Sequence, residues 1–359
     1  MNKIAFIVPY PIGIAPSQRF RFEQYLPYLK ESGYTFQSFS FLSSKDYQRL
    51  YQSGLFVQKS ASIVKGFLRR TILMFQLSQY HVIFIHREAS PIGPPIFEWI
   101  ITKILKKKII YDFDDAIWMK NTSQSNKLIS NIKHHSKVES ICKWSEMVLC
   151  GNLYLMDYAK RYNTKVAYMP TTIDTENLHN STKIHDDQKV TLGWTGTHST
   201  IKYLYAIEDL LTELQKQHQF DFIVISNKDP QFKNLNYTYI SWNKATEVKD
   251  LLKFDIGIMP LIDDEWAKGK CGFKALQYMA LEIPCVISPV GVNTGIIQDG
   301  INGFIAKSEN EWSEKITLLI NSKEKRTQIG KEGRETVIKK YSTLSHKNAF
   351  LMQFEKLIN

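Results

Sequence analysis

The residues best suited to binding a charged ligand lie between positions 257 and 303 of this 359-residue chain. The stretch has the pattern of a buried strand, a loop with Lys270, a helix opening near Cys271 and Gly272, and a second strand that runs into a glycine turn. Free N–H groups and the helix dipole favour negative charge at a helix N-terminus, so this edge of a parallel sheet predicts a phosphate site. Lys274 lies four residues after Lys270, although a solvated helix face would look the same.

A second candidate group follows the next predicted strand. The backbone N–H groups of Val292, Asn293 and Thr294, after Gly291, fit an anion-binding nest. In the alternative interpretation Gly272 only permits close helix packing and Gly291 only serves a turn.

Polar residues also cluster where other predicted strands end. These clusters are Tyr10-Pro11-Ile12-Gly13, His86-Arg87-Glu88, Asp112-Phe113-Asp114-Asp115 and Gly196-Thr197-His198. Open α/β sheets bind ligands outside the carboxyl ends of their strands, so four such ends predict one site shared between the two halves of the chain.

The acidic cluster has three interpretations. Asp112-Phe113-Asp114 could hold a metal, Asp114 or Asp115 could cap a helix, or the carboxylates could contact a bound substrate. His86 and Glu88 could orient or deprotonate a substrate group, although the same tripeptide suits an internal salt bridge. We take His86, Glu88, Asp114 and Asp115 as catalytic candidates.

Strands and helices alternate along the chain. The predicted strands are 3–9, 34–41, 81–86, 108–112, 147–150 and 165–169 in the first half, and 190–194, 220–226, 237–240, 254–260 and 283–288 in the second. Ser17 could cap a helix through Glu31, a further helix starts near Ser199, and about 309–359 is helical without a strand. The alternation predicts an α/β protein of two doubly wound, Rossmann-like halves joined near 170–188.

Composition is ordinary for a globular protein, with 43% hydrophobic and 23% charged residues. The four cysteines form no CxxC pair and suggest buried, reduced thiols in a cytosolic protein. The apolar start of the chain is too short for a signal peptide, and no run approaches 18 apolar residues, so we expect no membrane span.

Positive charge is concentrated in the first half. Residues 1–180 hold 23 Lys and Arg against 13 Asp and Glu, whereas 181–359 hold 23 against 22. Basic and apolar residues mix in 61–76 and 102–110, which suggests docking on an anionic membrane face. The alternatives are an ordinary amphipathic helix and a lysine-rich genome composition.

Several of these segments resemble a known family. GKCGFKALQYMALEIPCVISPVGVN (269–293), GWTGTHSTIKYL (193–204), PSQRFRFEQYLPYL (16–29), YDFDDAIW (111–118) and GNLYLMDYAKRYN…YMPTTID (151–174) resemble bacterial glycosyltransferases of the GT-B fold, in the large retaining group called family 4. The resemblance implies an acceptor-binding domain over 1–172, joined by a last helix at about 341–359, and a nucleotide-sugar-binding domain over 173–340, facing an interdomain cleft. It also implies metal-independent chemistry without a cofactor, so we expect no metal site.

The resemblance implies which residues bind the donor. The family's basic pair for the diphosphate falls on Thr197 and Lys202, so the lysine is kept and the arginine is missing, and Lys270 or Lys274 could supply the lost charge. Gly13 and Arg19, with Arg21 nearby, could face the diphosphate from the first domain.

The family's two carboxylates on the sugar-binding helix are absent. Their positions hold Gly269 and Gln277, of which Gln277 could still hydrogen-bond the ribose. Asp263, Asp264 or Glu265 could substitute for the missing acid at Gly269.

The leading hypothesis is a glycosyltransferase that moves a sugar from a nucleotide diphosphate, of UDP or GDP type, to a lipid-linked or polysaccharide acceptor with retention. It would be cytoplasmic, peripheral on the inner face of the cell membrane, and act in cell-surface polysaccharide or glycolipid biosynthesis. The alternative is a non-catalytic sugar-nucleotide-binding subunit of a glycosylation complex. A Rossmann oxidoreductase is disfavoured because no GxGxxG follows the first strand, and no nucleic-acid-binding module is present.

Overall fold

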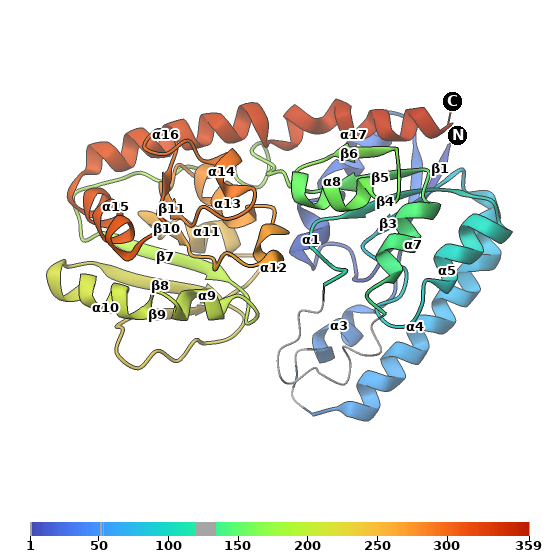
Figure 1. Cartoon of the computed structure of the whole chain (residues 1–359), viewed down its shortest axis with the longest axis horizontal. Helices are drawn as coiled ribbons and strands as arrows, with labels where there is room; N and C mark the ends of the chain where they lie inside the picture. The colour runs from blue at the N-terminus through green and yellow to red at the C-terminus, as the bar shows by residue number, and fades with distance from the viewer. Residues whose placement is uncertain (1, 51, 53, 120–133, 359) are drawn as a thin grey trace. The chain divides into compact units, whose positions relative to one another are not determined.

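The computed structural model describes residues 2–50, 52, 54–119 and 134–358. The chain divides into two compact units (Figure 1). Unit 1 comprises Met1–Thr171 and His346–Asn359, and unit 2 comprises Thr172–Ser345.

Unit 1 is built on a six-stranded parallel sheet. Its strands are β1 (Lys3–Val8), β2 (Thr35–Ser40), β3 (Val82–His86), β4 (Lys108–Phe113), β5 (Met147–Cys150) and β6 (Val166–Tyr168), in the order β2-β1-β3-β4-β5-β6. β3 and β5 are buried along their whole length, as is usual for parallel strands covered on both faces. Because all strands run the same way, the residues after Val8, His86 and Phe113 meet at one edge.

The helices of unit 1 flank this sheet. They are α1 (Pro16–Arg19), η1 (Glu23–Tyr25), α2 (Leu26–Glu31), α3 (Ser44–Leu50), α4 (Phe56–Gln76), η2 (Leu77–Gln79), α5 (Ile96–Trp99), η3 (Ile100–Ile104), α7 (Lys137–Trp144) and α8 (Leu153–Lys160). Phe350 and Phe354, from the last helix of the chain, belong to the same core as Phe6 and Phe84.

The helix predicted from Ser17 to Glu31 is wrong as a single element. It is divided into α1, η1 and α2, and Ala15 rather than Ser17 occupies the N-cap. Pro27 has no N–H to donate and its ring would clash with the preceding turn of a continuous helix, so the chain starts a new helix at Leu26 with this proline in the first turn.

Unit 2 repeats the plan with a second six-stranded parallel sheet. Its strands are β7 (Thr191–Gly196), β8 (Asp221–Ser226), β9 (Thr238–Ser241), β10 (Ile256–Met259), β11 (Cys285–Ile287) and β12 (Phe304–Ile305), in the order β12-β11-β10-β7-β8-β9. Its helices are α9 (Ile201–Tyr205), α10 (Glu208–Gln217), α11 (Glu247–Leu251), α12 (Glu265–Lys268), α13 (Phe273–Ala280), α14 (Asn293–Ile296), α15 (Glu309–Asn321) and α16 (Lys323–Lys340), and α17 (Thr343–Ile358) follows. The predicted pair of Rossmann-like parallel sheets is confirmed.

Two strand glycines bring aromatic rings onto the second sheet. A Cβ at Gly193 would lie 2.1 Å from the Phe254 ring, and a Cβ at Gly257 would lie 2.5 Å from the Tyr278 ring. The Tyr278 hydroxyl accepts a hydrogen bond from the Thr195 N–H at 3.1 Å and so ties α13 to the end of β7. This close packing fixes the helix that carries the predicted donor residues.

Candidate active site

In unit 2 the loop with Lys270 leads directly into α13. Asp264 caps α12 by accepting from the Ala267 N–H at 2.6 Å, and the chain then turns through Gly269 to Gly272, which caps α13 with a φ of 67°. The predicted helix opening at Gly272 is confirmed. The Lys270 ammonium lies 4.9 Å from the centre of the Trp266 ring.

The turn after β11 packs against this helix start. A Cβ at Gly272 would lie 2.3 Å from Ile296 and 3.6 Å from Asn293 Oδ1, and one at Gly291 would lie 2.9 Å from the Lys268 carbonyl. Lys270, Gly272, Val292 and Asn293 come from segments about twenty residues apart in the sequence, and the fold brings them to one place. Thr294, at the start of α14, is exposed and donates its hydroxyl to the Gly291 carbonyl.

Asn293 has an unusual environment at this junction. Its side chain is fully buried and donates from Nδ2 to the Ser288 carbonyl at 2.9 Å. Its Oδ1 is buried and finds no hydrogen-bond partner among the residues that the structure describes. Most buried polar atoms have a partner, so this oxygen marks a place where a ligand group could complete the hydrogen bonding.

The other predicted donor residues lie near the ends of β7 and α13. The Lys274 ammonium is 5.7 Å from the Trp194 ring on β7, which places it beside the strand that ends at Gly196. Thr197 is exposed in the following turn, and the Lys202 side chain lies over the ring of Tyr203.

Gln277 is enclosed rather than open. It is 2% exposed, and its amide lies 3.4 Å from His179 and 3.5 Å from Glu247, which also accepts from the Trp242 indole N–H. Sequence reasoning missed Glu247, because an acid in the first turn of a helix is common for helix-dipole reasons alone.

The three acids suggested as substitutes at Gly269 lie on or beside α12. Asp264 caps α12, Glu265 pairs with Lys268 at 2.6 Å, and Asp263 is exposed.

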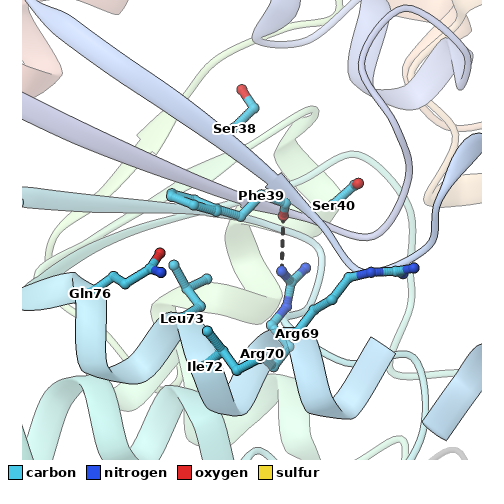
Figure 2. A pocket seen from close by; sticks show the side chains of 8 residues that line it. All are labelled: Ser38, Phe39, Ser40, Arg69, Arg70, Ile72, Leu73 and Gln76. Atoms are coloured by element: carbon cyan, nitrogen blue, oxygen red, sulfur yellow. Dashed lines mark hydrogen bonds between the residues drawn. The ribbon is translucent and has the colours of Figure 1, made fainter. Parts of the chain in front are cut away.

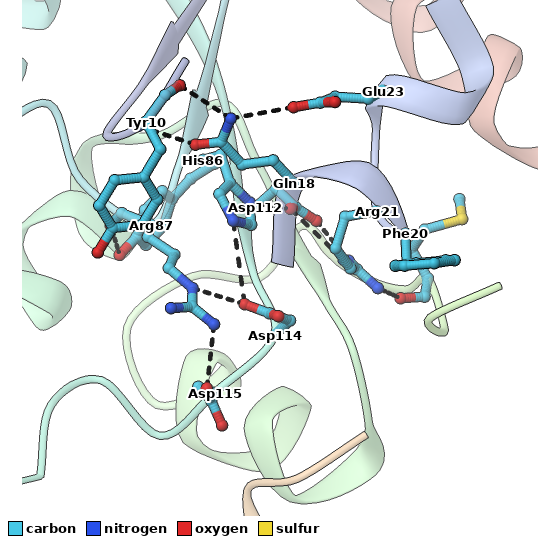
Figure 3. A network of polar contacts seen from close by, with 12 residues as sticks. Tyr10, Gln18, Phe20, Arg21, Glu23, His86, Arg87, Asp112, Asp114 and Asp115 are labelled. Atoms are coloured by element: carbon cyan, nitrogen blue, oxygen red, sulfur yellow. Dashed lines mark hydrogen bonds and ion pairs between the residues drawn. The ribbon is translucent and has the colours of Figure 1, made fainter. Parts of the chain in front are cut away.

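In unit 1 the central feature is a buried chain of charged groups (Figure 3). His86 Nδ1 lies 2.7 Å from Asp112 Oδ2, and the other Asp112 oxygen pairs with the Arg21 guanidinium, which also donates to the Met169 carbonyl. Burial by itself would raise the pKa of Asp112, but Arg21 and His86 hold it below its usual value. An ionised Asp112 only accepts, so the proton of this contact lies on His86 Nδ1.

The arrangement leaves one imidazole nitrogen directed at the predicted acids. His86 Nε2 is fully buried, has no hydrogen-bond partner among the described residues, and lies 4.0 Å from Asp114 Oδ1. Asp114 and Asp115 accept from Arg87 at 2.7 and 3.0 Å. Burial alone would raise the pKa of Asp114, but the charges of Arg87 and His86 hold it well below its usual value.

The backbone after β4 rules out one interpretation of the acidic cluster, the helix cap. Neither Asp114 nor Asp115 begins a helix, because residues 114–119 form bends and turns. Within the described ranges, no group of three or more His, Cys, Asp and Glu side chains could hold a metal ion. Glu88 forms an ion pair with Lys137 at 2.7 Å, so the expected alternative of an internal salt bridge is correct for this residue.

The loop after β1 is held by two polar side chains. The Gly13 N–H donates to Glu23 at 2.7 Å, and the buried Gln18 side chain both accepts from the Tyr10 N–H and donates to its carbonyl. Arg19 is mostly buried, with its guanidinium 4.9 Å from the Phe20 ring. Arg21, expected near the diphosphate, forms a buried ion pair with Asp112.

The basic segments predicted to meet a membrane are partly internal. Arg70 donates to the carbonyls of Val8, Phe39 and Ala89, and Arg69 donates to the Phe41 carbonyl. Lys107, which is half-buried, and Lys108, which is exposed, also donate to backbone carbonyls. Figure 2 shows Arg69 and Arg70 in a groove of about 300 Å³ between β2 and α4, which none of the predicted site residues lines.

No helix in the described part of the chain is long and apolar enough to cross a membrane.

Comparison with known proteins defines the class. Residues 232–336 match the family model described as Glycosyl transferases group 1. The whole chain is similar in structure to a glycosyltransferase from Rickettsia africae (TM-score 0.69, 14% identity, 100% of this chain and 99% of that one) and to sucrose-phosphate synthase from Thermosynechococcus elongatus (0.67, 11%, 99% of each). It is also similar to Anabaena HepE in complex with UDP-glucose (0.61, 10%, 99% and 100%). No curated sequence matches it.

The paired parallel sheets and these likenesses give the chain the GT-B fold, and it is a glycosyltransferase. More specifically, unit 2 carries the domain of the glycosyl transferases group 1 family, which includes the Lys270 loop, α13 and the turn after β11.

Proposed function

We propose that this enzyme is a family 4-like glycosyltransferase that moves a sugar, with retention, from a nucleotide-diphosphate sugar to a lipid-linked or polysaccharide acceptor. The donor-binding part of this proposal rests on one observation: the Lys270 loop, the α13 N-terminus and the turn at Val292 and Asn293 pack together. It combines a cation, the N-terminus of α13 and a buried Asn293 oxygen that has no hydrogen-bond partner among the described residues. Such a set suits a diphosphate with a sugar attached.

The difficult step is departure of the diphosphate from an oxocarbenium-like sugar. Lys270 and Lys274, together with the first-turn N–H groups of α13, would stabilise the charge that develops on the leaving phosphate. Removing one such contact typically costs about 10²–10³ in rate. Gln277 and Glu247, which contact each other, would hydrogen-bond the ribose hydroxyls. Thr197 and Lys202 would contact the diphosphate from the end of β7.

The acceptor half rests on the acids after β4. Asp114 and Asp115 keep some exposure, whereas His86 behind them has none, so the two carboxylates would contact the acceptor hydroxyl. Asp112 orients His86, whose Nε2 lies 4.0 Å from Asp114 Oδ1 and would help to position this carboxylate against the acceptor hydroxyl. Glu88 forms an ion pair with Lys137 and would help to position the loop that follows β3. Gly13 and Arg19 would form the β1 side of this site.

The wider role that we propose is biosynthesis of a cell-surface polysaccharide or glycolipid. The enzyme would act in the cytoplasm, on the inner face of the cell membrane, with no metal requirement. UDP-sugars are the first donors to test, since HepE has been crystallised with UDP-glucose, although a GDP-sugar would fit the same diphosphate contacts.

A thermal-shift screen against UDP-, GDP-, ADP- and CMP-sugars tests the donor site. A ligand at 100 times its Kd adds about 2.7 kcal/mol to the free energy of unfolding, so the true donor raises the melting temperature clearly. Lys270→Ala should remove the shift, whereas Lys331→Ala, at an exposed position on α16, should keep it. A shift that survives Lys270→Ala unchanged contradicts the assignment.

Incubation of the purified protein with its donor distinguishes an enzyme from a non-catalytic binding subunit. Slow hydrolysis of the bound donor, or transfer to any acceptor, excludes the non-catalytic alternative that the missing carboxylates at Gly269 and Gln277 raise. A donor that binds tightly but is never hydrolysed or transferred supports that alternative.

A further inference from the structure

Helix α4 exposes a row of apolar side chains on the face opposite its packed face. Figure 1 shows α4 as a long helix at the outer side of unit 1. The row consists of Val57, Val64, Leu68, Ile72 and Phe75, each more than half exposed. Steps of seven, four, four and three residues keep these side chains on one face. The buried residues Ser62, Gly66, Arg70 and Leu73 lie on the other face.

The row is long and bears no negative charge. From Val57 to Phe75 it extends about 27 Å along the helix axis, and the α4 sequence contains no Asp or Glu. Lys65 is exposed at its border. α5 packs beside α4 through Phe97 on Phe67, 5.9 Å between ring centres, and exposes Ile96 and Trp99 as well.

The cations near this row contribute less than their number in the sequence suggests. Arg70 is buried, Arg69 and Lys107 are half-buried, and each donates to a backbone carbonyl of unit 1. Lys108 also donates to a carbonyl but is exposed, as are Lys65, Lys103 and Lys106. Attraction to an anionic surface therefore comes from a few lysines, and most of any binding free energy must come from the apolar row.

We propose that α4 is the element that contacts the lipid surface, lying in the plane of an anionic bilayer with this row among the acyl chains. This inference rests on the proposed function in one respect: a lipid-linked acceptor would explain why the enzyme binds a membrane. A helix that exposes Leu, Ile, Val and Phe on one face, with a lysine at the border of that face, is typical of an interfacial segment. A second copy fits less well, because two such rows packed face to face would bring the Lys65 ammonium groups of two helices without acids towards each other.

Vesicle sedimentation with the full chain tests the proposal. The probe is phosphatidylcholine vesicles with about one quarter phosphatidylglycerol, compared with pure phosphatidylcholine. The double variant Leu68→Gln with Phe75→Gln should bind the anionic vesicles at least about tenfold more weakly. The control, Ile184→Gln with Leu344→Gln, removes two exposed apolar side chains elsewhere and should bind like the wild type. Lys65→Gln with Lys106→Gln should weaken anionic binding and make it less sensitive to salt.

The outcomes are distinguishable. Equal vesicle binding by the wild type and the Leu68/Phe75 variant overturns the role of α4, and so does an absence of wild-type binding at low salt. A wild-type dimer that this variant converts to a monomer, without vesicle binding, assigns the row to a second copy and also overturns the proposal. The donor-induced thermal shift should be the same in all variants, so failure of the donor site is read separately from failure of the membrane surface.

Discussion

Replacing Asp112 by Asn tests the buried charge network of unit 1. The Arg21 side chain is 1% exposed and pairs with an Asp112 side chain that is 3% exposed. The substitution keeps the shape of the side chain but leaves the guanidinium buried beside a neutral amide. Breaking a buried ion pair by removing one partner typically costs about 3–5 kcal/mol. For a unit of this size each kcal/mol lowers the melting temperature by roughly 2–4 °C, so we expect a decrease of about 6–20 °C.

Calorimetry or near-UV circular dichroism at pH 7 measures this decrease. Asp157→Asn, at an exposed position on α8, serves as the matched control and should melt like the wild type. The double variant Arg21→Met with Asp112→Leu should recover part of the loss, because it removes both charges together. Melting of Asp112→Asn within about 1 °C of the wild type, which corresponds to less than about 0.5 kcal/mol, would refute the reasoning.

Three further predictions follow from local geometry and charge. Gly272→Val should lower the free energy of unfolding by about 1–3 kcal/mol and reduce the donor-induced thermal shift, because the φ of Gly272 is 67° and a Cβ there would lie 2.3 Å from Ile296. Gly295→Ala, at a position with open space around it, should be neutral in both assays. Arg87→Met should move the acidic limb of the pH profile of kcat/KM to higher pH, because Arg87 lowers the pKa of Asp114 and its loss lets that pKa rise; an unmoved limb would show that Asp114 is not the titrating group. The urea midpoint should fall as the pH drops from about 4 towards 2, since hydrogen bonds from Ser43 and Ser62 outweigh burial and lower the pKa of Asp46 to about 2, and Asp46→Asn should weaken this acid sensitivity.

Local patterns predicted much of the donor region. The stretch from Lys270 to Thr294 is nearly continuous, so strand, loop, helix and turn could be placed from residue types alone. The resemblance added the positions of Thr197 and Lys202. What it could not add was the environment of Gln277, because Glu247 and His179 are 30 and 98 residues away in the sequence.

Charge was the least predictable property. The segments around Arg69 and Lys107 have the sequence of a basic membrane patch, yet Arg70 is buried, and Arg69 and Lys107 are half-buried and donate to backbone carbonyls of the unit. A count of cations gives the net charge of a surface only where the side chains remain in solvent, and burial is decided by packing.

The sequence by itself determined the two parallel sheets, the helical C-terminal stretch and the glycine-bounded helix start beside Lys270, because these depend on periodicity and turn chemistry within a few residues. The tertiary structure alone decided that Asp112 pairs with Arg21, 91 residues away, that His86 directs Nε2 towards Asp114, and that α4 keeps an apolar row in solvent. Those outcomes depend on which side chains come into contact in the folded chain and on which groups are buried away from water. Sequence patterns over a few residues predict neither of these.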